Sequence, residues 1–358
     1  MHPVRPLVAV KAKVGELSAL SNLRSPQDAQ VSVLVELLDS VAPTGGRILP
    51  ALVRAAVRAA SHGRPLWIDT TWLTAGSPLA QQPGGVFEFL DHAIEFAAQA
   101  ELGLFAPDVA YLIPVVALDA SEYELRRVRL LLEHQDRDIA IRLPHSGGPL
   151  RELLGRIDSI MKSTGTRPGQ VHTILDAGFV ETVRPGQATA AAETASALSD
   201  LLGPATTTLL AGSIPARRTT YVTTERDRPE VTLWNETHHA SANGVSYGDY
   251  GVTHPLPPRS DGNPRTPNPY LCYTVPGKTV LLRRKVEEGD DPAERFTDLV
   301  EELAERNDFA GPDYSWGDGE LARCRRTGGR TAGSVSRWVA MATSHHIEHV
   351  ARRSATDL

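Results

Sequence analysis

Short runs of apolar, often β-branched residues alternate with longer stretches of helical periodicity along most of the chain. Such runs are typical of strands buried on both faces, and they recur at roughly 30-residue intervals, as in repeated βαβ units. Helix signals lie between them; Ser121 followed by Glu124, for example, forms a capping-box pattern. The eight runs occupy residues 7–13, 31–38, 65–73, 111–118, 139–144, 171–178, 206–215 and 245–251.

Eight strand–helix units predict an α/β fold with a closed, TIM-like (β/α)8 barrel. An open, doubly wound sheet is the alternative, less favoured because no glycine-rich phosphate loop follows the first run. We assign the barrel to residues 1–255 and a C-terminal α+β extension to residues 256–358. A proline-rich linker at 254–269 begins the extension, and we expect a hairpin and helices beyond it to pack on the barrel mouth.

Composition narrows the setting in which the protein works. A net charge of −6 provides no general attraction for nucleic acid. Only the arginine-rich segment 323–337 could contact the phosphates of a nucleic acid. The two cysteines do not form a disulfide framework, which favours a reducing, cytoplasmic location. Because no run approaches the ~18 apolar residues of a membrane span, no membrane association is expected.

Charged residues interrupt several apolar runs, where an unpaired buried charge would be costly. Such residues usually lie at strand ends, and the carboxyl ends of barrel strands surround the mouth, where active sites are found. Several carboxylates without a thiol suit Mg²⁺ or Mn²⁺, and cations beside them suit a phosphate group. Alternatively, these acids and bases only neutralise one another in the mouth. The acids are Glu36, Asp69, Asp176 and Asp249, and the bases are Lys11, Lys13 and Arg142.

Aromatic, acidic and histidine residues gather in two short motifs near the C-terminus. We expect His346 to transfer a proton in the mouth, and Trp316, Asp318 and His345 to contact the substrate. Alternatively, the histidines of this predicted helix only pack and form hydrogen bonds. His349 is expected on the solvent face. An H-x-x-E-H zinc site is not favoured because no third ligand follows the motif in this sequence.

A series of short motifs runs through nearly the whole chain. They are Lys11-Ala-Lys13-Val-Gly-Glu16, Val35-Glu36-Leu37, Leu175-Asp176-Ala177-Gly178, Ser213-Ile214-Pro215, Gly248-Asp249-Tyr250-Gly251, Tyr273-Thr274, Ser315-Trp316-Gly317-Asp318, Gly328, Arg337-Trp338 and Ser344-His345-His346-Ile347. In order and spacing this series resembles the phage beta-protein-like family, found in some phages and in bacterial genomes. The resemblance implies no established activity, and by association it suggests a role in phage–host conflict. The chain departs from the pattern in a proline-rich insertion at 255–269 and an Arg/Gly-rich stretch at 325–333.

Three functions fit these expectations. The first is a metal-assisted hydrolase of a phosphodiester or nucleotide, in which Glu36 and Asp176 activate water and Lys11, Lys13 and Arg142 hold the phosphate. The second is a non-catalytic module of an anti-phage system that binds a small ligand, a nucleotide or a protein. The third, a purely structural subunit, predicts an exposed apolar patch and no cavity.

Overall fold

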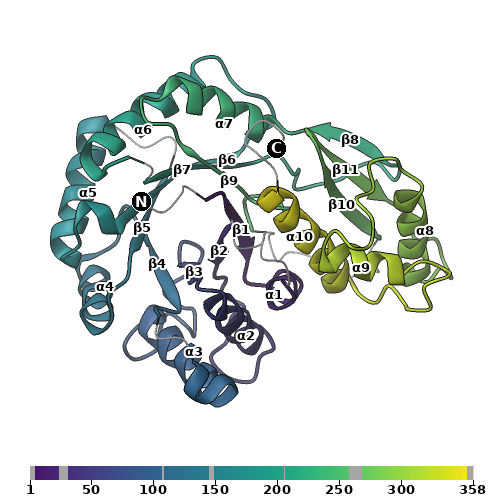
Figure 1. Ribbon diagram of the computed structural model, residues 1–358, viewed down its shortest axis with the longest axis horizontal. Coiled ribbons are helices and arrows are strands. Elements are labelled where there is room, and N and C mark those ends of the chain that lie inside the picture. The colour runs from purple at the N-terminus through teal and green to yellow at the C-terminus, as the bar shows by residue number, and fades with distance from the viewer. Residues whose placement is uncertain are drawn as a thin grey trace.

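The computed structural model describes residues 5–23, 31–106, 109–144, 149–204, 206–257, 268–352 and 358. Its larger part is a closed barrel of eight parallel strands, and Figure 1 looks into this barrel. The strands follow one another around the barrel in chain order, and the last pairs with the first. The prediction of a TIM-like barrel is therefore confirmed. The barrel strands are β1 (Leu7–Lys11), β2 (Ser32–Glu36), β3 (Leu66–Asp69), β4 (Leu112–Ala117), β5 (Ile139–Pro144), β6 (Val171–Phe179), β7 (Thr207–Gly212) and β9 (Ser246–Asp249).

Helices surround the barrel, each following a strand as the hydrophobic spacing predicts (Figure 1). The side chain of Ser121 accepts a hydrogen bond from the amide of Glu124, and the Glu124 carboxylate accepts one from the amide of Ser121, so the predicted capping box is present. The helices are α1 (Val14–Ser21), α2 (Ile48–Ser61), α3 (Val86–Leu102), α4 (Glu122–His134), α5 (Leu150–Thr164), α6 (Gln187–Leu202) and α7 (Pro229–Ala240), with short 3-10 turns η2 (Gly103–Phe105) and η3 (Pro168–Gln170).

Side chains from the strands separate into two apolar layers, because successive residues of a strand point to opposite faces. Val8, Val10 and Val35 belong to the layer between the strands and the helices. The other layer fills the interior of the barrel and consists of Leu7, Ala9, Leu34, Trp67, Ile113, Val115, Ala140, Ile174, Leu210 and Tyr250. The barrel is thus a packed core, and space for a ligand exists only near its two ends.

Strand register brings the charged residues of neighbouring strands to one level. Lys11 is the register partner of Glu36, which is in turn the partner of Asp69. Asp176 of β6 is paired with Pro144, two residues beyond Arg142. These side chains therefore meet at the carboxyl end of the barrel, the end called the mouth below.

A second, three-stranded antiparallel sheet lies beside the barrel, at the right of Figure 1. One of its strands, β8, comes from the segment between β7 and β9, and the sequence pattern does not predict it. The elements of this part, here called the cap, are β8 (Thr224–Asp227), β10 (Tyr270–Val275), β11 (Lys278–Arg283), α8 (Pro292–Ala304), α9 (Trp316–Arg323) and α10 (Val335–Arg352).

Helix α10 belongs to both parts of the molecule. Its residues Ile347 and Val350 are buried in the same apolar cluster as the barrel strands and helices. At its other end, Trp338 is 1% exposed and stacks on Phe296 of α8 with ring centroids 4.7 Å apart. Helix α10 therefore takes the place beside β9 and α1 that a helix directly after the last barrel strand would occupy. In sequence it comes only after the other cap elements.

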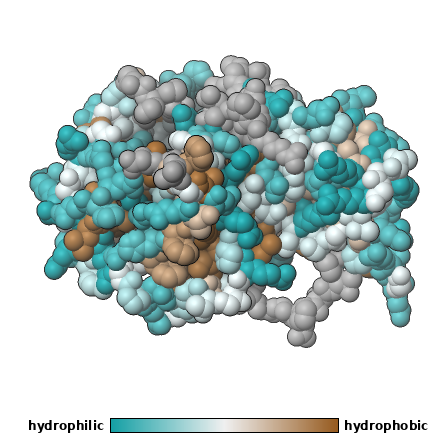
Figure 2. Space-filling model, turned by 60° about the horizontal axis from the view of Figure 1, so that its bottom comes forward, coloured by the Kyte–Doolittle hydropathy of each residue, from teal (hydrophilic) through white to brown (hydrophobic). Residues whose placement is uncertain are grey.

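The outer side of the barrel at α2 and α3 is partly apolar. Figure 2 turns this side of the molecule toward the reader and shows apolar side chains gathered on it. Phe96 of α3 and Phe105 of η2 are 77% and 90% exposed, more than any other large apolar side chain among the described residues. Within the described part of the chain, no helix is long and apolar enough to cross a membrane.

Candidate functional site

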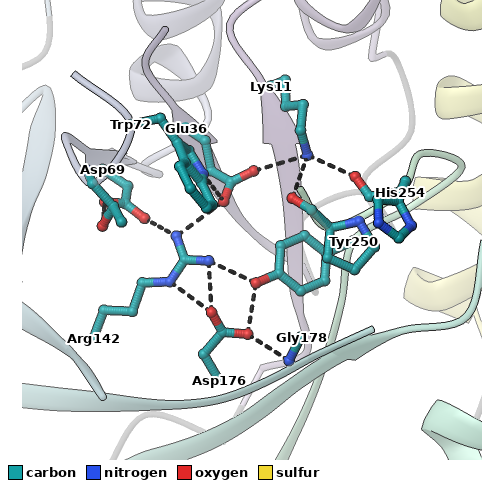
Figure 3. A network of polar contacts seen from close by, with 11 residues as sticks. Lys11, Glu36, Asp69, Trp72, Arg142, Asp176, Gly178, Tyr250 and His254 are labelled. Carbon is teal, nitrogen blue, oxygen red and sulfur yellow. Dashed lines mark hydrogen bonds and ion pairs between the residues drawn. The ribbon is translucent and has the colours of Figure 1, made fainter. Parts of the chain in front are cut away.

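The guanidinium of Arg142, at the end of β5, lies at the centre of a polar network in the mouth (Figure 3). Its Nε and Nη2 atoms donate to Oδ2 of Asp176 at 3.0 and 2.7 Å. Its Nη1 atom donates to Oε1 of Glu36 at 2.9 Å and also to Asp69. The predicted gathering of charged residues from β2, β3, β5 and β6 is present, and a cation occupies the point where three carboxylates converge. Together with Lys11, Trp72 and Tyr250, these residues form the mouth network.

Lys11 closes the side of the mouth network that faces the cap. Its ammonium group donates to Oε2 of Glu36 at 3.2 Å and to the carbonyl oxygens of His254 and Pro255 at 2.9 and 2.8 Å. The segment after β9 therefore crosses over Lys11, which is only 1% exposed (Figure 3). Trp72, from the loop after β3, donates its indole N–H to Oε1 of Glu36 at 2.9 Å.

Tyr250 completes the mouth network. Its hydroxyl donates to Oδ1 of Asp176 at 2.6 Å and accepts from Nη2 of Arg142 at 2.6 Å. Burial, followed by the Asp176 carboxylate, raises the pKa of Tyr250 well above its ordinary value, so the phenol remains a donor. Neither Tyr250 nor Trp72 is among the site residues predicted from the sequence. Tyr250 directly follows Asp249 at the end of a predicted strand, and this position next to the mouth could have indicated that it is a site residue.

The charged groups of the mouth network are paired with one another. Burial alone lowers the pKa of Arg142, but the acidic neighbours, Asp69 first, outweigh it and hold that pKa above its ordinary value. Glu36 and Asp69 are 0% and 1% exposed, and their oxygens accept from Arg142, Lys11, Trp72 and Thr71. Asp176 differs from them, because its side chain is 17% exposed. It is the acid of the network that a ligand can reach.

The predicted metal ligands do not fit a divalent cation. Three of them, Glu36, Asp69 and Asp176, converge on the Arg142 guanidinium, which takes the position that a metal would need. The fourth, Asp249, belongs to a different cluster. Among the described residues, no group of three or more His, Cys, Asp or Glu side chains is arranged to hold a metal ion. No chemical step through Mg²⁺ or Mn²⁺ follows from this geometry.

Asp249 lies in a buried cluster between the barrel and α10. Its Oδ2 atom accepts from Tyr247 at 2.7 Å and from Arg228 at 3.2 Å, and Nε2 of His346 lies 2.9 Å from both carboxylate oxygens. Burial alone raises the pKa of Asp249, but His346 and Arg228 outweigh it and lower that pKa to about 2. Nδ1 of His346 is 2.7 Å from the hydroxyl of Thr274. His346 thus links α10 to β9 and β10, and both of its ring nitrogens are engaged.

Asp318 lies at the centre of a third cluster, inside the cap. It is 0% exposed and accepts from Tyr273 at 2.7 Å and from Ser315 at 2.6 Å. Nδ1 of His345 is 2.9 Å from the Asp318 carboxylate, and its Nε2 is 2.7 Å from the carbonyl oxygen of Thr274. Both ring nitrogens of His345 are therefore engaged. The Ser-Trp-Gly-Asp motif and His345 therefore join α9, α10 and β10, and Trp316 lies apart, beside a surface cavity between α9 and α10.

Two further predicted positions lie elsewhere. Lys13 is the N-cap residue of α1 and is half-buried, and its side chain makes no capping hydrogen bond among the described residues. Burial lowers the pKa of Lys13, and Lys11 lowers it further, against the opposite effect of Glu16. His349 is 2% exposed, so its expected place on the solvent face is wrong. The face of α10 that carries His349 is covered because this helix packs against α1 of the barrel and against α9 and β10 of the cap.

A cavity of about 600 Å³ opens beside Asp176 on the side of the mouth away from the cap. Its wall includes the side chains of Arg142 and Trp72 from the mouth network. Exposed Asp119 and Glu152 lie at its rim, and Arg156 is held there by hydrogen bonds to the carbonyl oxygens of Leu118 and Ala120. Within the described part of the chain, the mouth is therefore closed above Lys11 and open above Asp176.

One known protein family matches nearly the whole of this chain. The family model described as Beta protein matches residues 5–352. The chain belongs to the Beta protein family. The resemblance noted in the order of its sequence motifs is thereby confirmed. Among the curated proteins compared, none matches it.

Two of the solved structures that match this chain are distant from it. An alanine racemase of Clostridium difficile 630, in complex with cycloserine, is 10% identical with a TM-score of 0.32, over 70% of this chain and 51% of that chain. This chain thus spans about half the length of the racemase. A protein described as a fructose-1,6-biphosphate aldolase, from Coccidioides immitis, is 10% identical with a TM-score of 0.29, over 70% of this chain and 74% of that chain.

The family motifs of this Beta protein fall into three polar clusters. Lys11, Glu36, Asp176 and Tyr250 belong to the mouth network. Asp249 and His346 form the link between barrel and α10, and the Ser-Trp-Gly-Asp and Ser-His-His motifs meet at Asp318. Only the first cluster borders a cavity at the barrel mouth, and it is the candidate functional site.

Proposed function

We propose that this Beta protein binds a small organic cation, such as a primary or quaternary amine, in the cavity beside Asp176. The observation that supports the proposal is the net negative charge of the mouth. Among the described residues, five carboxylates face three cations, Lys11, Arg142 and Arg156; the carboxylates are those of Glu36, Asp69, Asp119, Glu152 and Asp176. A cation entering the cavity would be attracted by this excess, and a phosphate would be repelled.

The wall of the cavity has the chemistry that recognises an ammonium group. Asp176 presents a carboxylate already oriented by Arg142, Tyr250 and the amide of Gly178, which donates at 2.9 Å. Trp72 is partly exposed and lines the same cavity, and the face of an indole ring attracts cations. A preoriented carboxylate beside an aromatic face is a suitable ammonium site, because neither group needs to reorganise when the ligand arrives.

The hydrolase hypothesis from the sequence receives less support from this arrangement. Two of the groups expected to hold phosphate, Lys11 and Arg142, have their charges balanced by buried carboxylates. Glu36, expected to activate water, is 0% exposed and therefore out of reach of a ligand. The binding-module hypothesis is therefore the one we retain, and its setting in phage–host conflict stays a prediction. The structural-subunit hypothesis expected an exposed apolar patch, which the side of the barrel at α2 and α3 carries, and no cavity, whereas the described residues line one.

A thermal-shift screen tests the proposal. We expect choline, putrescine or glucosamine to raise the Tm of the full chain at millimolar concentration, because a ligand that binds only the folded state stabilises it. Inorganic phosphate and AMP are the comparison ligands for this site. Asp176→Asn, and separately the rim variant Asp119→Asn/Glu152→Gln, should reduce the rise produced by the amine.

Asp158→Asn is the matched control, because this exposed carboxylate on α5 pairs with Lys162 outside the cavity. It should keep the full amine response. The proposal fails if none of the three amines raises the Tm, or if their effect survives in both mouth variants. A rise with Mn²⁺ that Asp176→Asn abolishes would instead support the metal-assisted hydrolase.

A further inference from the structure

Another cavity, of about 610 Å³, lies between α3 and α4, which are neighbours around the barrel (Figure 1). It is here called the α3–α4 cavity. The loop that joins β3 to α3, residues 70–85, borders it on one side, and the end of β4 forms its inner wall. The residues that line it lie within 70–88 and 115–128, inside the described ranges 31–106 and 109–144. Its volume is that of a small-molecule pocket.

The inner wall of the α3–α4 cavity is apolar. Val116 of β4 and Val128 of α4 are 4% and 2% exposed and belong to the apolar layer between the strands and the helices. The half-buried side chains of Leu73, Val86 and Phe87 line the cavity from the loop and from the start of α3. An apolar group that enters the cavity leaves water and extends this layer, which favours its binding.

A positive charge borders the α3–α4 cavity. The guanidinium carbon of Arg127, on α4, lies 4.7 Å from the ring centroid of Tyr123, and its Nη2 atom donates to the Tyr123 hydroxyl. That hydroxyl is neutral, so it satisfies a donor without balancing the charge. Among the described residues, the buried Nε atom of Arg127 has no hydrogen-bond partner, and Arg127 forms no ion pair. The guanidinium is thus oriented by an aromatic ring and still lacks an anion.

A negative charge lies beside the same turn as Arg127. Gly84 and Gly85, the last two residues before α3, have φ angles of +82° and +85° and carry no side chain that would keep their neighbours away. A Cβ atom on Gly84 would lie 2.6 Å from the carboxyl carbon of Glu88, and one on Gly85 would lie 3.2 Å from Cδ of Arg127. The carboxylate and the guanidinium therefore flank consecutive residues of one turn.

Glu88 is the carboxylate of this cavity that remains available to a ligand. It is half-buried and forms no hydrogen bond or ion pair with any described residue. The second carboxylate is that of Glu124, whose Oε2 atom accepts from the amide and the hydroxyl of Ser121, each at 2.7 Å. Since two carboxylates and one guanidinium are the charged groups among the described lining residues, a purely anionic ligand would be repelled as well as attracted.

We infer that the α3–α4 cavity binds a free α-amino acid with an apolar side chain. Its carboxylate pairs with Arg127, its ammonium group pairs with Glu88, and its side chain contacts the apolar wall. A ligand of single charge would leave one of the two protein groups unpaired, whereas a zwitterion satisfies both. This inference does not rest on the proposed function of the mouth. Among the described residues, the cavity shares Ala117 alone with the cavity beside Asp176.

Titration of the full chain with L-leucine, followed by calorimetry at constant ionic strength, tests the inference. We expect saturable binding of leucine and weaker binding of glycine, which lacks the apolar side chain. Isocaproate lacks the ammonium group and isoamylamine lacks the carboxylate, so each should bind less tightly than leucine. Arg127→Gln and Glu88→Gln should each weaken leucine binding by about tenfold or more, as expected for losing one hydrogen bond to a charged group.

Arg126→Gln and Glu101→Gln are the matched controls, because these exposed residues lie on α4 and α3 outside the cavity. Both should keep the affinity of the unmodified chain for leucine, and circular dichroism checks that every variant is folded. Loss of leucine binding in a folded Asp176→Asn variant would place the site at the mouth and overturn the inference. So would undiminished binding in the Glu88→Gln/Arg127→Gln double variant, equal affinities for leucine and isoamylamine, or no binding of leucine by the unmodified chain.

Discussion

Buried charges at the strand ends are the residues on which both the mouth and the α10 junction depend. Arg142 pairs with side chains from β2, β3 and β6. In the second cluster, Arg228 and His346 both pair with Asp249 of β9. A buried charge is tolerated when partners surround it, and the removal of one partner leaves the others uncompensated. Each cluster is therefore a unit whose members depend on one another.

Asp249 makes this coupling measurable as a dependence of stability on pH. Its pKa is about 2 in the folded protein against an ordinary value of 3.8. Ionised Asp249 thus stabilises the folded state above about pH 4 by about 2 kcal/mol, and this contribution is lost as the pH falls toward 2. We expect Asp249→Asn to lower the free energy of unfolding at pH 7, and the difference from the unmodified chain to shrink below pH 4. Urea denaturation at several pH values measures both.

Asp158→Asn serves again as the control, because the exposed Asp158–Lys162 pair contributes little to stability. Its difference from the unmodified chain should be small at every pH. A large Asp249→Asn difference that stayed constant from pH 7 to pH 3 would show that the carboxylate is not ionised through its partners as described.

At the scale of elements, the cap is held together where α9 crosses α10. The amide of Gly317 donates to the hydroxyl of Ser344 at 3.0 Å, and the two helices approach closely enough to exclude any side chain there. Asp318 and His345 then join the same two helices one residue further along. The Ser-Trp-Gly-Asp motif is thus explained by helix packing as well as by its carboxylate.

Gly317→Ala tests this close approach. A Cβ atom at position 317 would lie 2.1 Å from the carbonyl oxygen of Met341, which is backbone and cannot turn aside. We expect a loss of about 1–3 kcal/mol in the free energy of unfolding, as for other overpacked sites. Gly155→Ala is the matched control, because Gly155 lies in α5 with no atom within 4 Å of the added Cβ. It should stabilise the protein by up to about 1 kcal/mol through helix propensity, so equal effects of the two changes would contradict this account.

At the scale of the whole molecule, one element from the sequence range of the barrel belongs to the cap sheet, and one helix from the C-terminal range packs in the barrel core. Strand β8, from within residues 1–255, pairs with β11 of the cap, and α10, from residues 256–358, is part of the barrel core. A chain that ended at residue 255 would expose the α10-facing side of α1 and leave Asp249 without His346. The proposed division at 255 is therefore a boundary in sequence that many contacts cross.

We expect a fragment of residues 1–255 not to unfold cooperatively, because it lacks the helix that completes its apolar core. Urea denaturation followed by near-ultraviolet circular dichroism distinguishes a packed barrel from a collapsed chain. Co-expression of the fragment with residues 256–358 should restore a cooperative transition. A sharp transition of the fragment alone would show that residues 1–255 form an independent domain.

The pattern of apolar and charged residues along the sequence was enough to predict the barrel and its polar mouth. Apolar runs at regular intervals predicted eight strands and a barrel, and charges such as Glu36, Asp69 and Arg142 inside those runs predicted a polar mouth. Both follow from interactions within a short segment: a buried strand excludes unpaired charge, and strands of similar length in a parallel barrel end at one level.

Only the tertiary structure decided which charges neutralise one another. Arg142 lies 106 residues from Glu36 in the chain, and His346 lies 97 residues from Asp249, so neither pairing leaves a trace in local periodicity. Side-chain electrostatics acts over a few ångströms in space, and the fold alone determines which distant residues come that close.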